Sequence, residues 1–355
     1  MMMRTTTAGV LAAAVLAAAA GCQSTGAGNR DRNAPAQATA PVSSAPADNR
    51  ETFNSPEEAL KALQSVVQTG DPAAMDKLFG PEIDQVRSSD TADRKATMQR
   101  FEQAMAQKAH VETSADGQSA NIYIGANDYP FAIPLAKDPS GKWFFDTAAG
   151  ETEILNRRIG RDELDTIDLC HLLVTAEREY ASQDRVGNGI IQYAQRFMSE
   201  PGKEDGLYWP AQPWEQESPL GPLAAQAAAE GYPVKARAQR AEEKGSEAAK
   251  NSGPHPFHGY IFRILTKQGS AAPGGAYNYV INGHMVAGFA FLAYPAEYGK
   301  SGVMTFMISR NNVLYQKDLG ADTAARAKAI TSFDPGKGWT VVKEDQGAAS
   351  QPGGQ

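Results

Sequence analysis

The sequence predicts an α+β protein made of two modules, and two observations support this prediction. In each half, helical patterns come first and short strand patterns separated by turn signals follow, which is typical of helices packed on an antiparallel sheet. A chain of 355 residues is long enough for two domains of ordinary size. We therefore expect one α+β module over residues 51–155 and a second over residues 156–343.

Helical patterns open the first module. Ser55 is a capping residue, Pro56 suits the first turn, and Glu58 stands where a capping box places an acid. Two further helices are expected after Asp71 and after Asp90, because each aspartate precedes apolar residues at helical spacing.

Strand patterns follow the third helix. Asp116-Gly117 is a hairpin signal, and two later turns contain proline or glycine. The expected strands cover residues 110–115, 119–125, 131–137 and 142–147. Helices that precede such a meander again predict an α+β fold.

The phrases GDPAAMDKLFGPE and GKWFFD make this module similar to nuclear transport factor 2-like domains. That resemblance implies a cone in which helices cover a curved antiparallel sheet, and such cones often contain a pocket. The polar candidates for a pocket, Asp128, Tyr129 and His110, are scattered along the sequence and provide no acid–base pair.

The second module is expected to begin with a helix after Gly160, because Asp162, Glu163 and Asp165 would suit its first turn. Its apolar face would consist of Leu164, Ile167, Cys170 or His171, Val174 and Ala181. Residues rich in β-branched and aromatic side chains then predict strands at 258–266, 288–294, 303–309 and 313–318.

This second pattern resembles the globular head of type IV pilins and pseudopilins. The resemblance rests on HGYIFRI, FAFLAYPAEYGKSGVMTFMI and NNVLYQKDLG. It implies a long helix beside an antiparallel meander. The long apolar N-terminal helix that pilins use for assembly is missing, so the resemblance does not imply filament formation.

The N-terminus has the pattern of a lipoprotein signal. Arg4 supplies positive charge, residues 8–18 form an apolar stretch too short to span a bilayer, and small residues precede Cys22. We expect residues 1–21 to be the signal peptide and Cys22 to carry acyl chains such as palmitate, with an ordinary secretory signal cut near Gly21 as the alternative. Lipidated Cys22 would anchor the protein in the bacterial envelope, at the outer membrane or its periplasmic face.

Residues 22–50 are rich in Ala, Pro, Ser and Gly, and they predict a flexible tether, while residues 344–355 predict a disordered tail. The chain has 34 basic and 41 acidic residues, a net charge of −7. An acidic chain with interspersed charges lacks the basic footprint of a nucleic-acid-binding protein. Cys170 is the second of two cysteines and is expected to be a small core residue.

The whole chain, from about Phe53 to Val342, is similar to the bacterial family called Domain of Unknown Function 2950. The resemblance rests on EILNRRIGRDEL, YAQRF, PGKEDGLYWP, SPLGPL, APGGAYNYVINGHM, YPAEYG and YQKDLG. It implies an exported envelope protein, often lipid-anchored, and it implies no activity, substrate or catalytic residue.

No motif in the sequence indicates a catalytic residue, a cofactor or a metal site. The segment from Asp184 to Gln195 is similar to a calcium loop, but it offers one carboxylate, so a helix-ending turn is the favoured interpretation. His255 and His258 are close in sequence without the further ligands that zinc requires.

Three functions remain open. The leading hypothesis is a non-enzymatic lipoprotein that binds an envelope protein or polymer. The aromatic residues Tyr208, Trp209, Tyr294 and Tyr298 are candidate partner-binding residues, although packing is the favoured interpretation for each. The alternatives are an enzyme with a pocket in the first module, which needs several converging ionisable groups, and an accessory protein of a pilus or secretion system.

Overall fold

The computed structural model describes residues 50–212, 214–230, 232 and 256–343. The predicted signal peptide (1–21), residues 22–49 of the predicted tether and the predicted tail (344–355) lie outside these residues. Arg50 was expected to end the tether, but its side chain is buried in the fold. Its guanidinium donates to the carbonyl of Phe145 at 3.1 Å and pairs with Glu82 at 2.8 Å.

The expected helices of the first half are present, with one addition. Ser55 caps the first helix by accepting from the N–H of Glu58 at 3.2 Å, while the Glu58 carboxylate accepts from the N–H of Asn54 at 2.8 Å. Asp71 and Asp90 cap the next two expected helices through their side chains. The short helix α3 was not predicted. The helices are α1 (Pro56–Thr69), α2 (Pro72–Phe79), α3 (Ile83–Val86) and α4 (Thr91–Gln107).

An antiparallel sheet follows, with strand order β1-β2-β4-β5 and with β3 paired to β2. The expected strand over 131–137 is correct only at its end, where β4 forms, because the chain leaves the sheet between β3 and β4. Pro130 and Pro134 flank the break, and a proline has no N–H to donate to a neighbouring strand. The strands are β1 (Ala109–Thr113), β2 (Ser119–Ile124), β3 (Tyr129–Pro130), β4 (Leu135–Lys137) and β5 (Trp143–Phe145).

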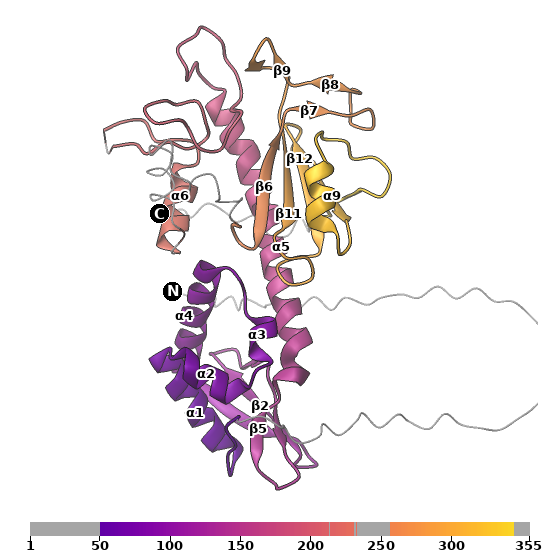
Figure 1. The fold of residues 1–355 in the computed structure, drawn as a ribbon. Helices are drawn as coiled ribbons and strands as arrows, with labels where there is room; N and C mark the ends of the chain where they lie inside the picture. Colours follow the sequence, from indigo (N-terminus) through magenta and orange to yellow (C-terminus); the bar gives the residue numbers. More distant parts are fainter. Residues whose placement is uncertain (1–49, 213, 231, 233–255, 344–355) are drawn as a thin grey trace, which may run out of the picture. The chain divides into compact units, whose positions relative to one another are not determined.

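One long helix, α5 (Thr147–Tyr180), continues from this sheet into the second half (Figure 1). The expected helix start after Gly160 is wrong, and the expected boundary between residues 155 and 156 falls inside α5. Asp146 caps the true start by accepting from the N–H of Ala149 at 3.0 Å. Gly150 allows α5 to pass close to the strand break, since a Cβ there would lie 2.7 Å from the carbonyl oxygen of Ala132. None of the described helices is long and apolar enough to cross a membrane.

The second half is built on a sheet with strand order β14-β13-β12-β11-β6. The four expected strands lie within two residues of their predicted limits. The principal strands are β6 (Tyr260–Leu265), β11 (Ala290–Pro295), β12 (Met304–Ser309), β13 (Leu314–Asp318) and β14 (Thr340–Val341). Every residue of β11 is buried, so both faces of this central strand are covered.

Shorter elements complete the second half. Two helices, α6 (Gly221–Ala229) and α9 (Thr323–Ala329), were not predicted, and α9 packs on β11 (Figure 1). Two small antiparallel pairs were also not predicted: β7 (Lys267–Gln268) with β8 (Tyr277–Asn278), and β9 (Val280–Ile281) with β10 (His284–Met285).

Each half has its own hydrophobic core. In the second half, α5 packs on β11 and β12 through Leu169, Cys170, Leu173 and Val174. Cys170 is fully buried, as expected, whereas Leu164 was expected on the apolar face and is 65% exposed. The face of α5 that meets this core is therefore shifted from the predicted one.

A carboxyl group is enclosed in the second core. Glu177 of α5 is fully buried, and its Oε2 accepts from the N–H of Ala194 at 2.9 Å. Its Oε1 finds no hydrogen-bond partner among the described residues. Burial raises the pKa of Glu177 to about 8, and the bond from Ala194 opposes that rise. Glu177 is therefore protonated in the folded protein at neutral pH.

Candidate functional site

The first half contains a half-open cavity of about 650 Å³ between its helices, its sheet and the start of α5. This volume lies within the range of small-molecule pockets, roughly 300–1,000 Å³. Apolar side chains form most of the wall. They come from α1 (Leu63, Val67), α2 (Met75, Phe79), α3 (Ile83, Val86), α4 (Met98, Phe101), the sheet region (Ile124, Phe131, Ile133) and α5 (Ile154).

The polar part of the wall is strongly cationic. Six basic side chains line the cavity: Arg87, Arg94, Lys95, Arg157, Arg158 and Arg161. Asp93 is the one carboxylate among the described lining residues. The chain as a whole has a net charge of −7, so the charge of this lining is opposite in sign to that of the chain.

Helix α5 supplies three of these arginines from adjacent turns. Arg157 and Arg161 are one turn apart, and Arg158 follows Arg157 directly. Arg157 is held by the carboxylate of Glu153 at 2.6 Å, by the carbonyl of Pro130 at 2.7 Å and by the ring of Tyr129, whose centroid is 4.5 Å from the guanidinium carbon. Arg157 is therefore fixed at the cavity wall.

Arg161 is also paired. Its guanidinium lies 3.0 Å from Asp93 and 3.1 Å from Asp162. Asp162 is buried, and its burial raises its pKa to about 7, although the charge of Arg161 acts in the opposite direction. Arg161 thus ties α4 to α5 and compensates part of the charge of a buried carboxylate.

Arg158 differs from both neighbours. Its guanidinium donates to the carbonyl of Val86, and within the described part of the chain no carboxylate oxygen lies within 4.0 Å of it. The side chain is partly buried, and this burial lowers the pKa of Arg158, while Asp93 and Asp162 oppose the change. A partly desolvated guanidinium without a direct counterion is a strong binding group for an anion.

The exposed cations of α4 lie on the same cavity. Arg94 donates to the carbonyl of Ser88 at 3.0 Å and to the hydroxyl of Thr91 at 3.3 Å, and neither partner carries charge. Lys95 is exposed beside it. Arg94, Lys95 and Arg158 therefore retain positive charge that the nearby carboxylates do not directly neutralise.

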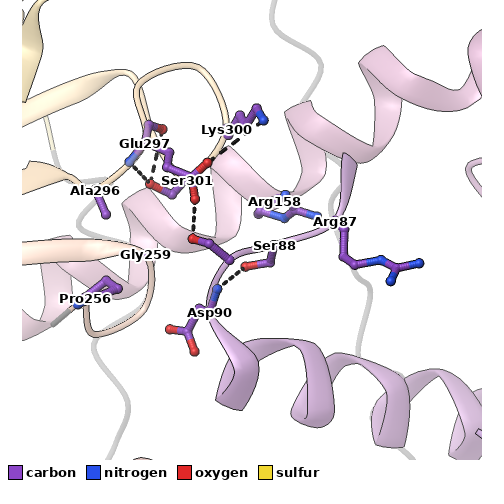
Figure 2. Close-up of a pocket in the computed structure, with 11 residues that line it drawn as sticks. Arg87, Ser88, Asp90, Arg158, Pro256, Gly259, Ala296, Glu297, Lys300 and Ser301 are labelled. Carbon is purple, nitrogen blue, oxygen red and sulfur yellow. Dashed lines mark hydrogen bonds and ion pairs between the residues drawn. The ribbon is translucent and has the colours of Figure 1, made fainter. Parts of the chain in front are cut away.

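A second, much smaller pocket lies next to this region and has room for about one water molecule, with a volume of about 10 Å³. Figure 2 shows Arg87, Ser88 and Arg158 on one side of it and Glu297 and Ser301 on the other. Arg158 lines both the large cavity and the small pocket.

An ionic cluster lies close to the small pocket. The ring of His258 contacts Asp165 and Glu230, each at 3.1 Å. Burial alone would lower the pKa of His258, but the hydrogen bond to Asp165 and the charges of both acids raise it overall. Asp90, which caps α4, also accepts from the hydroxyl of Tyr232 at 2.8 Å. These contacts join segments that are distant in sequence.

The four candidate partner-binding aromatics do not gather at one place. Trp209 and Tyr294 are buried in the second core, so the structure uses them for packing. Tyr208 is partly buried against the same core, and Tyr298 donates to the carboxylate of Asp318 at 3.2 Å. A partner contact by any of these four aromatic residues stays a prediction, and Cys22 lies outside the described residues.

The loop that is similar to a calcium site is held as a turn by its own aspartate. The carboxylate of Asp184 accepts from the backbone N–H groups of Val186, Gly187 and Gly189 at 3.2, 2.9 and 2.6 Å. These bonds hold the pKa of Asp184 below its usual range. They support the interpretation of this segment as a turn that follows α5.

The sequence analysis did not predict the arginines of the cavity, because the pocket residues it considered were an acid, a tyrosine and a histidine. Of the scattered pocket candidates, Tyr129 does line the cavity, whereas Asp128 lies 3.5 Å from His110 and 2.6 Å from Lys108 and does not. The available signal was the arginine spacing in EILNRRIGRDEL, which places three cations on neighbouring turns of one helix.

Comparisons with known proteins identify the family and add no fold or activity. No curated protein and no solved structure matches the chain, so the likenesses to nuclear transport factor 2-like domains and to pilins are not confirmed. The family described as "Protein of unknown function (DUF2950)" matches residues 50–342. The matched region begins at Arg50, whose side chain is buried, and ends in the last described segment. The chain belongs to this family.

Proposed function

We propose that the protein is a membrane-anchored lipoprotein of the bacterial envelope whose N-terminal half binds an apolar ligand without catalysing a reaction. The signal pattern that ends at Cys22 supports the location. The cavity of about 650 Å³ with its apolar wall supports the binding function, and it is the observation on which this proposal depends.

The chemistry of the cavity favours binding over the alternative of an enzyme. Acid–base catalysis needs at least one group that exchanges protons near neutral pH. The ionisable lining residues in the described structure are arginines, Lys95, Tyr129 and Asp93, and Asp93 is engaged with Arg161. The alternative of a pilus or secretion accessory rests on the pilin resemblance alone.

The binding function is tested with Nile red, a neutral apolar dye whose fluorescence rises in apolar surroundings. Met98 lines the cavity from α4, and the adjacent Gln99 is exposed and does not line it. Met98→Trp should fill part of the cavity and abolish saturable dye binding, whereas Gln99→Trp should leave it unchanged. Equal dye binding by both variants would show that the cavity is not the site.

The anchor is tested separately by growing cells with labelled palmitate. The wild-type chain should incorporate label and fractionate with membranes, and Cys22→Ser should do neither. A wild-type chain that remains unlabelled would contradict the lipoprotein assignment, and it would leave the binding function of the cavity to the dye experiment.

A further inference from the structure

We propose that the ligand of this cavity is an anionic amphiphile with a single acyl chain, whose tail lies against the apolar wall and whose carboxylate or phosphate head is bound by Arg158. The inference rests on the proposed function, because it names the ligand class of the same cavity. Its physical basis is the division of one cavity into an apolar wall and a cationic wall.

The apolar wall requires a tail. The apolar side chains named above, from α1 to α5 and the sheet, form most of the cavity wall. A small hydrophilic anion would leave this surface in contact with water, whereas an acyl chain covers it and gains about 0.8 kcal/mol for each buried CH₂. The shape of the ligand is thus an extended or folded hydrocarbon chain.

The cationic wall requires an anionic head. Six cations and one carboxylate line the cavity, and carboxylates pair with three of the cations, Arg87, Arg157 and Arg161. Arg94, Lys95 and Arg158 have no such partner among the described residues. A neutral or cationic head would leave Arg158 partly desolvated without a counterion, whereas an oxyanion accepts the forked N–H donors of its guanidinium.

Arg158 is well placed for this contact. It is on a rigid helix and donates to the carbonyl of Val86 on α3, so its position is set by two elements of the cavity. Arg94 and Lys95 lie on α4 at the same cavity and are exposed, so they supply an attractive field to an approaching anion. The head is therefore expected between α4 and the arginines of α5.

The experiment measures displacement of Nile red from the full chain that carries Cys22→Ser, so that its own acyl group does not compete. Three amphiphiles with the same twelve-carbon tail are compared below their micelle concentrations: dodecanoate, dodecanol and dodecyltrimethylammonium. Dodecanoate should bind about 10- to 100-fold more tightly than the other two, which is the typical difference for a hydrogen bond to a charged group. Equal affinity of the three amphiphiles would overturn the inference.

Variants separate the head contact from the cavity itself. Arg158→Gln should weaken dodecanoate about 10- to 100-fold and leave dodecanol unchanged, and Arg158→Lys should restore part of the loss. The matched control is Arg100→Gln, on an exposed arginine of α4 that does not line the cavity. If Arg158→Gln weakens dodecanol as much as dodecanoate, the residue only shapes the cavity and the inference is wrong.

The tail and the source of the head are tested in the same assay. Each pair of CH₂ groups added between octanoate and dodecanoate should strengthen binding by about tenfold. Dodecanoyl lysophosphatidylglycerol distinguishes a lipid headgroup from a free acid: tighter binding than dodecanoate identifies a phospholipid, and weaker binding identifies a fatty acid. If Met98→Trp abolishes dye binding but none of the amphiphiles displaces the dye, the proposed ligand class is wrong and the binding function of the cavity stands.

Discussion

Glutamine at position 177 is expected to remove a specific part of the pH dependence of folding. Glu177 has a pKa of about 8 in the fold and 4.5 as its ordinary value, which applies to the unfolded chain. Below pH 4.5 both states hold the proton, so the residue costs nothing there. As pH rises from 4.5 to 8 only the unfolded chain releases it, and stability falls by about 1.36 kcal/mol for each pH unit. The loss amounts to on the order of 3 kcal/mol at pH 7 and 5 kcal/mol at pH 9.

Glu177→Gln has nearly the same shape and stays neutral at every pH. Its side-chain oxygen is able to accept the bond that Ala194 now donates to the carboxyl group. Urea unfolding followed by circular dichroism at about pH 5, 7 and 9 gives the free energy of unfolding. The variant should exceed the wild type by about 1 kcal/mol at pH 5 and by about 3 kcal/mol at pH 7, and the difference should keep growing up to pH 9.

The exposed Glu179, two residues later on α5, provides the control, and Glu179→Gln should track the wild type. Other buried acids, Asp162 among them, also lower stability as pH rises, but they act equally in every variant. If the free energies of Glu177→Gln and the wild type fall in parallel across this range, Glu177 is ionised in the fold and the reasoning from burial fails.

Further predictions concern a close backbone contact, a helix cap and a buried thiol. Gly150→Ala should destabilise the fold by about 1–3 kcal/mol because its Cβ would meet backbone at 2.7 Å, whereas Gly160→Ala, with nothing within 4 Å, should stabilise it by about 0.5–1 kcal/mol. Equal shifts of their melting temperatures would argue against this close contact. Asp90→Ala should cost about 1–2 kcal/mol in urea unfolding through loss of the α4 cap, and an unchanged midpoint would show that the cap contributes nothing. The thiol of Cys170 should react with a disulfide reagent only after denaturation, since it is buried and burial raises its pKa; rapid labelling of the native chain would contradict the placement.

The elements that the sequence predicted well are those that local chemistry determines. Caps at Ser55, Asp71 and Asp90 gave correct helix starts because a side-chain oxygen must satisfy the first N–H groups of a helix. The four principal strands of the second half were found because β-branched and aromatic runs lie between turn residues. Very short strands such as β7 to β10 escaped, since two residues carry no periodicity.

The errors come from contacts that no local pattern contains. Gly160 and the acids that follow it indicated a helix start, yet α5 runs through this stretch because packing in each half holds its two ends. The cavity could not be predicted from local patterns either, because the side chains of its wall are spread along the sequence from Leu63 to Arg161. The arginines of α5 could have been found by their spacing, but only the fold shows that an apolar space lies beside them.

The continuity of α5 fixes the angular register between the ligand cavity and the second core. Arg158 and Leu169 belong to one hydrogen-bonded rod of 34 residues, so about 100° of rotation accompanies every residue placed between them. A single insertion after Glu163 would rotate the two ends of the helix relative to each other, so that one end would lose its packing contacts. Insertions in the surface turns would not have this effect. Length should therefore vary little in this stretch, and any functional chimaera must exchange the helix whole.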